Sequence, residues 1–339
     1  MNKKSIRAVI TIIFSVSTLI QVAPIAQASQ SPVVAILDTA LDTSLPIFKD
    51  RIAYEVCILE WNSCPNGTNF MDGPGAATLP ISMLNNGRGF DHGTGVSSVV
   101  VNTDPNVKIV FIRIIGNTAY GQRQSASEVT VNNALSWVLA NKDKYNIKSI
   151  AMSQGHHNLG PVGTEYCPST PDTKNILVSL ANAGVATFFP AGNAGDHARL
   201  DWPACIQESI SVGWSDQYDK ISSNSNFDKN NLDFYALGNM RVSVPGGYTK
   251  SVGGSSISVQ VAATAWAVLK SKYPNYSQQQ LIDLFSKTSK QIYGSKGQFG
   301  KLIDLNAAIA LQDQKNEIDF IETEYQSEFN SIRADWNKK

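Results

Sequence analysis

The chain has 339 residues, of which 42% are hydrophobic, so it is long enough to bury a large core in one sizeable domain. Its 28 basic residues balance its 28 acidic residues, which gives a formal net charge of zero. This balance argues against electrostatic capture of nucleic acid or of an anionic membrane, and we expect neither as a partner.

Residues 1–28 are predicted to be a signal peptide. Lys3, Lys4 and Arg7 give a positive start, residues 8–22 are mostly apolar, and residues 26–28 have the small-x-small form of a cleavage site. The apolar stretch is interrupted by polar residues and falls short of the ~20 residues that a spanning helix needs. We therefore expect cleavage, no stable membrane anchor afterwards, and a secreted or periplasmic location in a bacterium.

Apolar runs that do not alternate with polar residues recur along the rest of the chain, at residues 33–37, 107–115, 149–152, 185–189 and 210–212. Such runs are typical of parallel strands that are buried on both faces. Helical patterns separate them, one capped at Ser127 and another over residues 173–183 that ends at Gly184. This alternation predicts an α/β fold with a mostly parallel central sheet and helices on both faces.

The last third of the chain reads as helical. Residues 259–272 suit a buried helix, and Ser277 caps another that runs through Phe285. Beyond residue 311 apolar side chains recur three or four positions apart, at Ile318, Ile321, Tyr325, Phe329, Ile332 and Trp336. We therefore predict a main domain over residues 29–311 and a C-terminal amphipathic helix over residues 312–339, whose role stays open.

The four cysteines are expected to form two disulfides, because an even number in an exported chain indicates pairing. Four cysteines allow three connectivities. Pairing of nearest neighbours is the simplest, so we predict Cys57–Cys64 and Cys167–Cys205. Their spacing does not match a zinc site.

Four polar side chains stand where chemistry is expected. Asp38 follows the first apolar run, at the carboxyl end where open α/β sheets place their sites. His92 is followed by Gly93 and Gly95, whose small size lets a helix start directly after it and pack closely. Asn193 lies in a Gly-rich stretch after a predicted strand. Ser256 precedes the apolar helix 259–272, whose N-terminus offers backbone donors and a positive dipole potential.

These four segments, in the order Asp, His, Asn and Ser, resemble the subtilisin-like serine peptidases, or subtilases, over roughly residues 32–311. The resemblance implies a three-layer α/β fold and a catalytic triad. In it Asp38 would orient His92 and stabilise its charged form, and His92 would act as the general base for the nucleophile Ser256. Asn193 would donate to the oxyanion of the tetrahedral intermediate.

The resemblance also implies a substrate site. Ser153, Gln154 and Gly155 would form one wall of the primary specificity pocket and pair with the substrate backbone, and Gly192 would belong to the other wall. No charge stands at these positions, so we expect no strict preference for a basic or acidic side chain. The substrate would be a protein or peptide. The chemistry needs no cofactor, and structural calcium, common in the family, stays open.

Two other interpretations remain. The chain departs from the family pattern at Ala40, Gly95, Ser258 and Gln260, and few residues separate the predicted cleavage site from the first strand. Both facts motivate a degenerate subtilase fold that is kept for binding. The stretch around Ser153 nearly matches a nucleophile elbow, and His197 lies downstream as a candidate base. This motivates an α/β-hydrolase that acts on esters, although the first Gly of the elbow is missing.

Overall fold

The computed structural model describes residues 31–160 and 167–336. The predicted signal peptide, residues 1–28, therefore lies outside the described residues. Among the helices that are described, none combines the length and the apolar character needed to cross a membrane.

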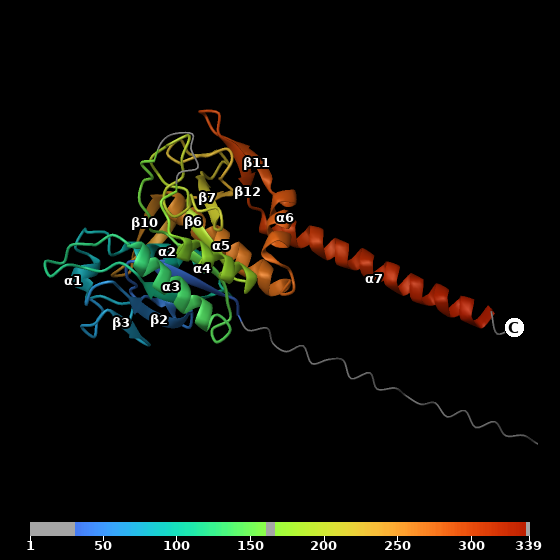
Figure 1. Cartoon of the computed structure of the whole chain (residues 1–339), viewed down its shortest axis with the longest axis horizontal. Coiled ribbons are helices and arrows are strands. Elements are labelled where there is room, and N and C mark those ends of the chain that lie inside the picture. The colour runs from blue at the N-terminus through green and yellow to red at the C-terminus, as the bar shows by residue number, and fades with distance from the viewer. Residues whose placement is uncertain (1–30, 161–166, 337–339) are drawn as a thin grey trace, which may run out of the picture. The chain divides into compact units, whose positions relative to one another are not determined.

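A ten-stranded sheet forms the middle of the fold, in the order β11-β12-β8-β7-β6-β5-β1-β4-β2-β3 (Figure 1). Each predicted apolar run became one of its parallel strands, because strands that are covered on both faces need apolar residues throughout. The parallel strands are β1 (Val33–Asp38), β2 (Ile52–Ile58), β4 (Lys108–Arg113), β5 (Ile147–Met152), β6 (Ala186–Pro190), β7 (Ile210–Ser215) and β8 (Phe234–Leu237).

Both edges of the sheet end in antiparallel pairs. At one edge β3 (Phe70–Asp72) pairs with β2, and at the other β11 (Lys290–Tyr293) pairs with β12 (Phe299–Leu302). A separate hairpin, β9 (Asn239–Val244) and β10 (Tyr248–Gly253), packs on helix α2 (His92–Thr103). The fold also has two short helices, η1 (Pro46–Phe48) and α1 (Ile81–Leu84).

Helices cover both faces of the sheet and give the three layers. Helices α2, α5 (Ser255–Lys272) and α6 (Gln278–Thr288) share one apolar cluster with the inward residues of the strands. Helices α3 (Glu128–Asn141) and α4 (Pro171–Asn182) share the other. Along β1 the side chains alternate between the two clusters, which is the period-2 geometry of a strand. The predicted α/β fold class is confirmed.

Local signals set the ends of three helices. The Ser127 hydroxyl accepts the backbone N–H of Thr130, 3.2 Å away, at the start of α3. At α6, Ser277 and Gln280 cap each other's backbone N–H groups in a capping box. Gly184 follows α4 with a φ of 80°, a conformation that a residue without a Cβ adopts without strain.

Two disulfides cross-link the chain. Cys57 at the end of β2 is bonded to Cys64 in the following loop, with an S–S distance of 2.05 Å. Cys167, just before α4, is bonded to Cys205 with an S–S distance of 2.01 Å. Both predicted pairings are present.

The last helix, α7 (Leu305–Trp336), begins seven residues before the predicted domain boundary at residue 312. Ala308 is buried and Gln312 is 6% exposed, so the first turns pack on the domain. Asp313 still contacts the domain, since it accepts from the Tyr273 hydroxyl at 2.6 Å and pairs with Lys272 at 2.9 Å. From there to residue 330 every residue is exposed.

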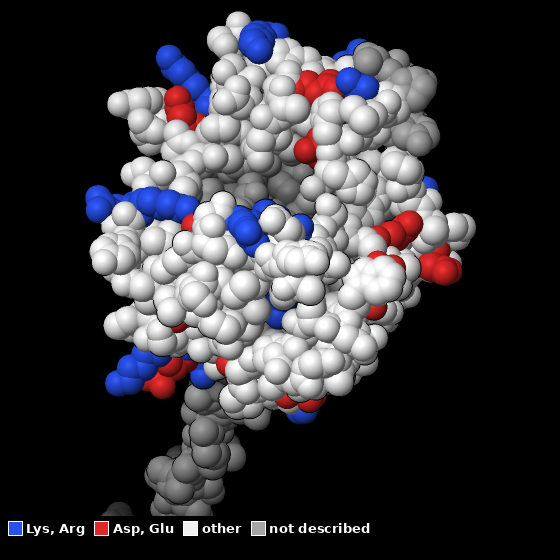
Figure 2. Space-filling view, turned by 90° about the vertical axis from the view of Figure 1, so that its left-hand side faces the viewer, with Lys and Arg blue, Asp and Glu red and all other residues white. Residues whose placement is uncertain are grey.

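The charges on the face shown in Figure 2 are mixed. Lys and Arg side chains and Asp and Glu side chains are both scattered over it, and on this face no large patch of a single sign forms. This distribution agrees with the zero net charge of the sequence.

Because residues 314–330 are exposed, shortening the chain to end at Gln314 is expected to leave the melting temperature within about 2 °C of that of the full chain. A chain that ends at Asp304 loses the turns of α7 that pack on the domain, and should melt several degrees lower. Differential scanning calorimetry of the three chains makes the comparison. A large loss of stability on removal of the exposed turns alone would show that they pack in solution.

Candidate active site

Asp38 ends β1, the strand between β4 and β5 in the sheet. Its carboxylate is fully buried, and Oδ1 accepts the backbone N–H of Thr39 at 2.7 Å. Burial by itself raises the pKa of this carboxyl. The charge and hydrogen bond of His92, with hydrogen bonds from Gln154 and Thr39, outweigh burial and hold the pKa below its ordinary value. Asp38 is therefore a buried, ionised acceptor.

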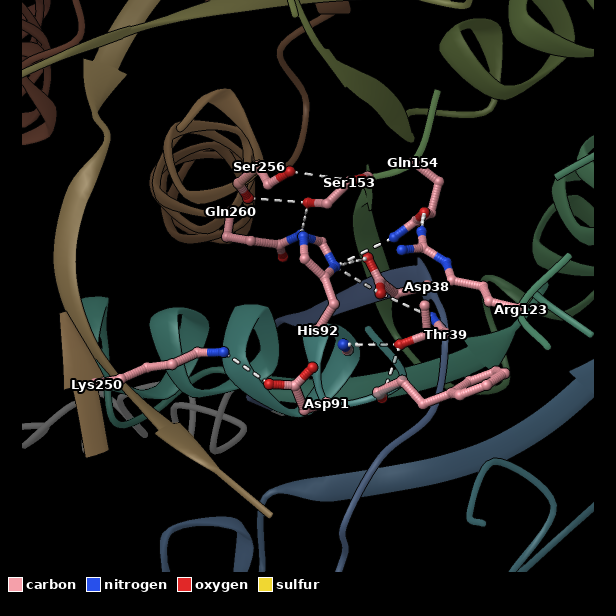
Figure 3. A network of polar contacts seen from close by, with 12 residues as sticks. Asp38, Thr39, Asp91, His92, Arg123, Ser153, Gln154, Lys250, Ser256 and Gln260 are labelled. Carbon is pink, nitrogen blue, oxygen red and sulfur yellow. Dashed lines mark hydrogen bonds and ion pairs between the residues drawn. The ribbon is translucent and has the colours of Figure 1, made fainter. Parts of the chain in front are cut away.

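His92 is the first residue of α2, and its ring meets Asp38. Nδ1 lies 2.8 Å from Asp38 Oδ1 and 3.1 Å from Oδ2, while the side chain keeps 31% of its surface exposed (Figure 3). Because the carboxylate can only accept, Nδ1 carries the proton and Nε2 is left as the basic nitrogen. The pair has the geometry of a general base with its orienting acid.

Gly93 allows this contact. A Cβ at Gly93 would overlap the carbonyl oxygen of Ala40 and lie 2.7 Å from the Phe111 ring, so only glycine fits where α2 meets β1 and β4. The backbone N–H of Gly93 also donates to the Thr39 hydroxyl at 2.9 Å. Ala40 is itself fully buried there, so this departure from the family pattern is accommodated without disturbing Asp38.

Ser256 is the second residue of α5 and lies in the same polar network (Figure 3). Its hydroxyl donates to the carbonyl oxygen of Ser153 at 3.3 Å, and the Ser153 hydroxyl donates back to the carbonyl of Ser256 at 2.9 Å. Between these described residues there is no hydrogen bond from Ser256 to His92. The structure thus brings Asp38 and His92 into contact and points the Ser256 hydroxyl toward β5.

Gln260, one turn further along α5, is a site residue that sequence reasoning noted only as a departure from the family pattern. Its amide donates to the Ser153 hydroxyl at 2.8 Å, and its side chain is fully buried. Its Oε1 has no hydrogen-bond partner within the described part of the chain. A polar residue inside the otherwise apolar predicted helix was the available signal.

Asn193 stands on an exposed loop beside the N-terminus of α5. Its Oδ1 accepts the backbone N–H of Ser255 at 2.9 Å and the Ser255 hydroxyl at 3.1 Å. With the carbonyl end fixed, the Nδ2 amide is the end left to donate to a ligand. This is the orientation that an oxyanion donor needs.

Asn226 supports this loop from behind. Its Oδ1 accepts the backbone N–H groups of Ala194 and Asp196, at 2.9 and 3.1 Å, and its own N–H donates to the carbonyl of Gly192. Its amide also donates to Asp201, which binds His157 at 2.9 Å. The loop that carries Asn193 is therefore held in place before any ligand binds.

The residues predicted to bind substrate differ in how far they are exposed to solvent. Ser153 and Gln154 are buried, each 6% exposed, and their side chains contact other site residues. Gly155 is exposed, and a Cβ there would overlap the carbonyl of Trp202. Gly192 has a φ of 113°. A role of these residues in substrate binding stays a prediction, and for Ser153 and Gln154 it would involve the backbone.

The described residues contain no group of three or more His, Cys, Asp or Glu side chains that could hold a metal ion.

Comparison with known proteins identifies the family. A model of the subtilase family matches residues 29–308, so the chain belongs to that family. The chain is 26% identical to a subtilisin of Bacillus pumilus over 280 residues, which cover 81% of this chain and 90% of that protein. It is 25% identical to subtilisin amylosacchariticus of Bacillus subtilis over the same number of residues, which span only 65% of that longer protein.

Solved structures show the same fold. A protease from Pseudoalteromonas arctica superposes with a TM-score of 0.66 at 17% identity, over 84% of this chain and 90% of that one. A cold-adapted subtilisin-like serine proteinase gives a TM-score of 0.59 at 19% identity, over 81% and 89%.

The alternative of an α/β-hydrolase is wrong. The family match excludes it. In addition, the Ser153 hydroxyl is occupied by Ser256 and Gln260, and His197, the base that this alternative would need, lies 3.3 Å from Gln298 instead.

Replacing Gly93 with Ala is expected to cost about 2 kcal/mol or more and to abolish any activity, because the added methyl group overlaps the Ala40 carbonyl and forces His92 away from Asp38. Gly95 is the matched control, since a Cβ there would lie 3.5 Å from Val242, an ordinary contact. Gly95→Ala should fold at least as well as the parent. Urea unfolding of both variants tests this, and equal stability would contradict the packing described for Gly93.

Proposed function

We propose that the chain is an exported serine endopeptidase, which hydrolyses peptide bonds through an acyl-enzyme at Ser256. The observation that carries the proposal is the 2.8 Å hydrogen bond between His92 and the buried, ionised Asp38, at the carboxyl edge of the sheet and beside the start of α5. The two disulfides support export, because disulfides persist in oxidising compartments.

The acylation step begins when substrate binds and Ser256 Oγ turns from the Ser153 carbonyl to His92 Nε2. The hydroxyl then attacks the substrate carbonyl carbon while Nε2 takes its proton. Asp38 stabilises the imidazolium that forms, without taking up a proton itself. The tetrahedral intermediate collapses as His92 gives the proton to the leaving amine, and the C–N bond breaks.

Deacylation repeats the same sequence with water. His92 removes a proton from the water, which attacks the ester carbonyl, and the proton passes to Ser256 Oγ as the acid product leaves. In both steps the negative oxygen of the intermediate would accept from Asn193 Nδ2 and from the backbone N–H of Ser256. The positive end of the α5 dipole adds to this stabilisation.

A second candidate function is binding without catalysis. The hydrogen bond of the Ser256 hydroxyl to the Ser153 carbonyl rather than to His92 favours it, as does the departure from the family pattern at Gln260, whose amide binds the Ser153 hydroxyl. In this case the fold would recognise a peptide without cleaving it.

An activity-based probe distinguishes the two functions. A fluorophosphonate is expected to label the purified protein at Ser256, and Ser256→Ala should lose both the label and the hydrolysis of a peptide library. Ser153→Ala should still be labelled, because Ser153 only supports the nucleophile. Labelling is read by peptide mass spectrometry. A folded protein that takes up no label and cleaves no peptide would contradict catalysis and favour the binding function instead.

The role of Asn193 can be separated from a structural one by kinetics. Asn193→Ala should lower kcat by about 10²–10³-fold with little change in KM, the size known for loss of one oxyanion donor in a subtilisin, because the contact strengthens only in the transition state. The backbone donor of Ser256 remains, so activity should fall without vanishing. Wild-type turnover, or a large fall in melting temperature together with both kinetic constants, would refute the assignment.

A further inference from the structure

Gln154 connects the Asp38–His92 pair to a cation. Its Oε1 accepts a hydrogen bond from the Arg123 guanidinium. Its Nε2 lies 3.1 Å from His92 Nδ1 (Figure 3), and its side chain is also among the hydrogen-bond partners that lower the pKa of Asp38. A guanidinium only donates, so the Arg123 contact fixes the carbonyl end of Gln154 and turns the amide end toward Asp38.

Arg123 is exposed, but its backbone is held in a tight turn between β4 and α3. Thr118 N–H donates to the Gln122 carbonyl at 2.9 Å, and Gln124 N–H donates to the Gly116 carbonyl at 3.0 Å. The turn presents the guanidinium to Gln154 from outside the sheet.

The other charged groups nearby are engaged elsewhere. Asp91, next to His92 on α2, pairs with Lys250 of β10 at 2.7 Å. Arg113, opposite Asp38 on β4, is buried and donates to the carbonyls of Ser63 and Ile115 and to Asn117. In the segment after β5, His157 binds Asp201 at 2.9 Å, and the ring of His156 stacks on Trp202. Among the described residues, Arg123 is thus the cation joined to the Asp38–His92 pair by a hydrogen-bonded side chain.

We propose that Arg123, acting through Gln154, is a positioning residue that sets the acid limit of the site by keeping His92 uncharged to lower pH. The inference rests on the proposed function as far as activity is concerned. It adds Arg123 to the site and gives Gln154 a second role there.

The sign of the effect follows from the charge. A cation beside the pair disfavours a second positive charge on the His92 ring, so the ring takes up its proton at lower pH when Arg123 is present. Gln154 also helps to fix the position of the Asp38 carboxylate, and the carboxylate in turn fixes the orientation of the His92 imidazole. Removing the guanidinium should therefore protonate the base at higher pH and loosen its orientation.

The test compares Arg123→Gln with Arg88→Gln. Arg88 is the matched control, since it donates to the Tyr120 carbonyl on the same turn and to none of the site residues. In Arg123→Gln the acid limb of the pH profile of kcat/KM should move up by about 0.5 pH unit, and kcat should fall about tenfold with KM and melting temperature unchanged. Arg88→Gln should follow the wild type.

Three further variants sharpen the test. Arg123→Lys keeps the positive charge but loses the planar guanidinium. Its acid limb should therefore lie close to that of the wild type, whereas its kcat should lie between those of the wild type and Arg123→Gln. Gln154→Leu breaks the same connection but leaves the Arg123 charge in place, so it should lower kcat as Arg123→Gln does and move the acid limb less. The double variant should lower kcat no further than Arg123→Gln alone. High salt should shrink the difference between wild type and Arg123→Gln.

An NMR titration of the His92 imidazole reads the same quantity without relying on hydrolysis. Its midpoint should move to higher pH by about 0.5 unit in Arg123→Gln and stay in place in Arg88→Gln. Identical midpoints in wild type and Arg123→Gln would overturn the inference, whether or not the protein cleaves peptides. A moved midpoint in a protein that cleaves nothing would uphold the inference and count against the proposed function alone.

Discussion

The close approach of the first turn of α2 to the end of β1 is the constraint on which the site depends. Gly93 lies against the carbonyl of Ala40 and the ring of Phe111, with no room for a side chain. That contact sets the distance between two groups that are 54 residues apart in sequence, the His92 ring and the Asp38 carboxylate. The close packing of α2 on the sheet thus positions His92 and Asp38 to form a 2.8 Å hydrogen bond.

A sheet covered on both faces confines its polar chemistry to the ends of its strands. Asp38 lies at such an end, fully buried, and desolvation alone would raise its pKa. Hydrogen bonds from His92, Gln154 and Thr39, with the charge of His92, reverse that effect. Asp38 thus stays ionised because several hydrogen-bond donors surround it. Arg123, which is exposed, donates in turn to one of these residues, Gln154.

The sequence alone predicted those strands and helix ends that a single local pattern determines. Unbroken apolar runs marked the parallel strands, Ser127 and Ser277 marked helix starts, and the glycines after His92 marked a helix packed closely on the sheet. It was insufficient where distant segments meet. No sequence pattern indicates that Arg123 contacts Gln154. The start of α7 at Leu305 was also missed, because the composition becomes polar only several residues later. The Ser256 hydroxyl binds the backbone carbonyl of Ser153, and Gln260 binds the Ser153 hydroxyl; only the packed structure reveals these contacts.

The central claim is that Ser256, His92, Asp38 and Asn193 act on one substrate carbonyl. A crystal structure with a peptide boronate tests it most directly. The account predicts a covalent bond from boron to Ser256 Oγ, with His92 Nε2 within hydrogen-bond distance of the adduct and one boronate oxygen bound by Asn193 Nδ2 and the Ser256 N–H. A Ser256 hydroxyl that stays on the Ser153 carbonyl, with the boronate absent or bound elsewhere, would contradict it.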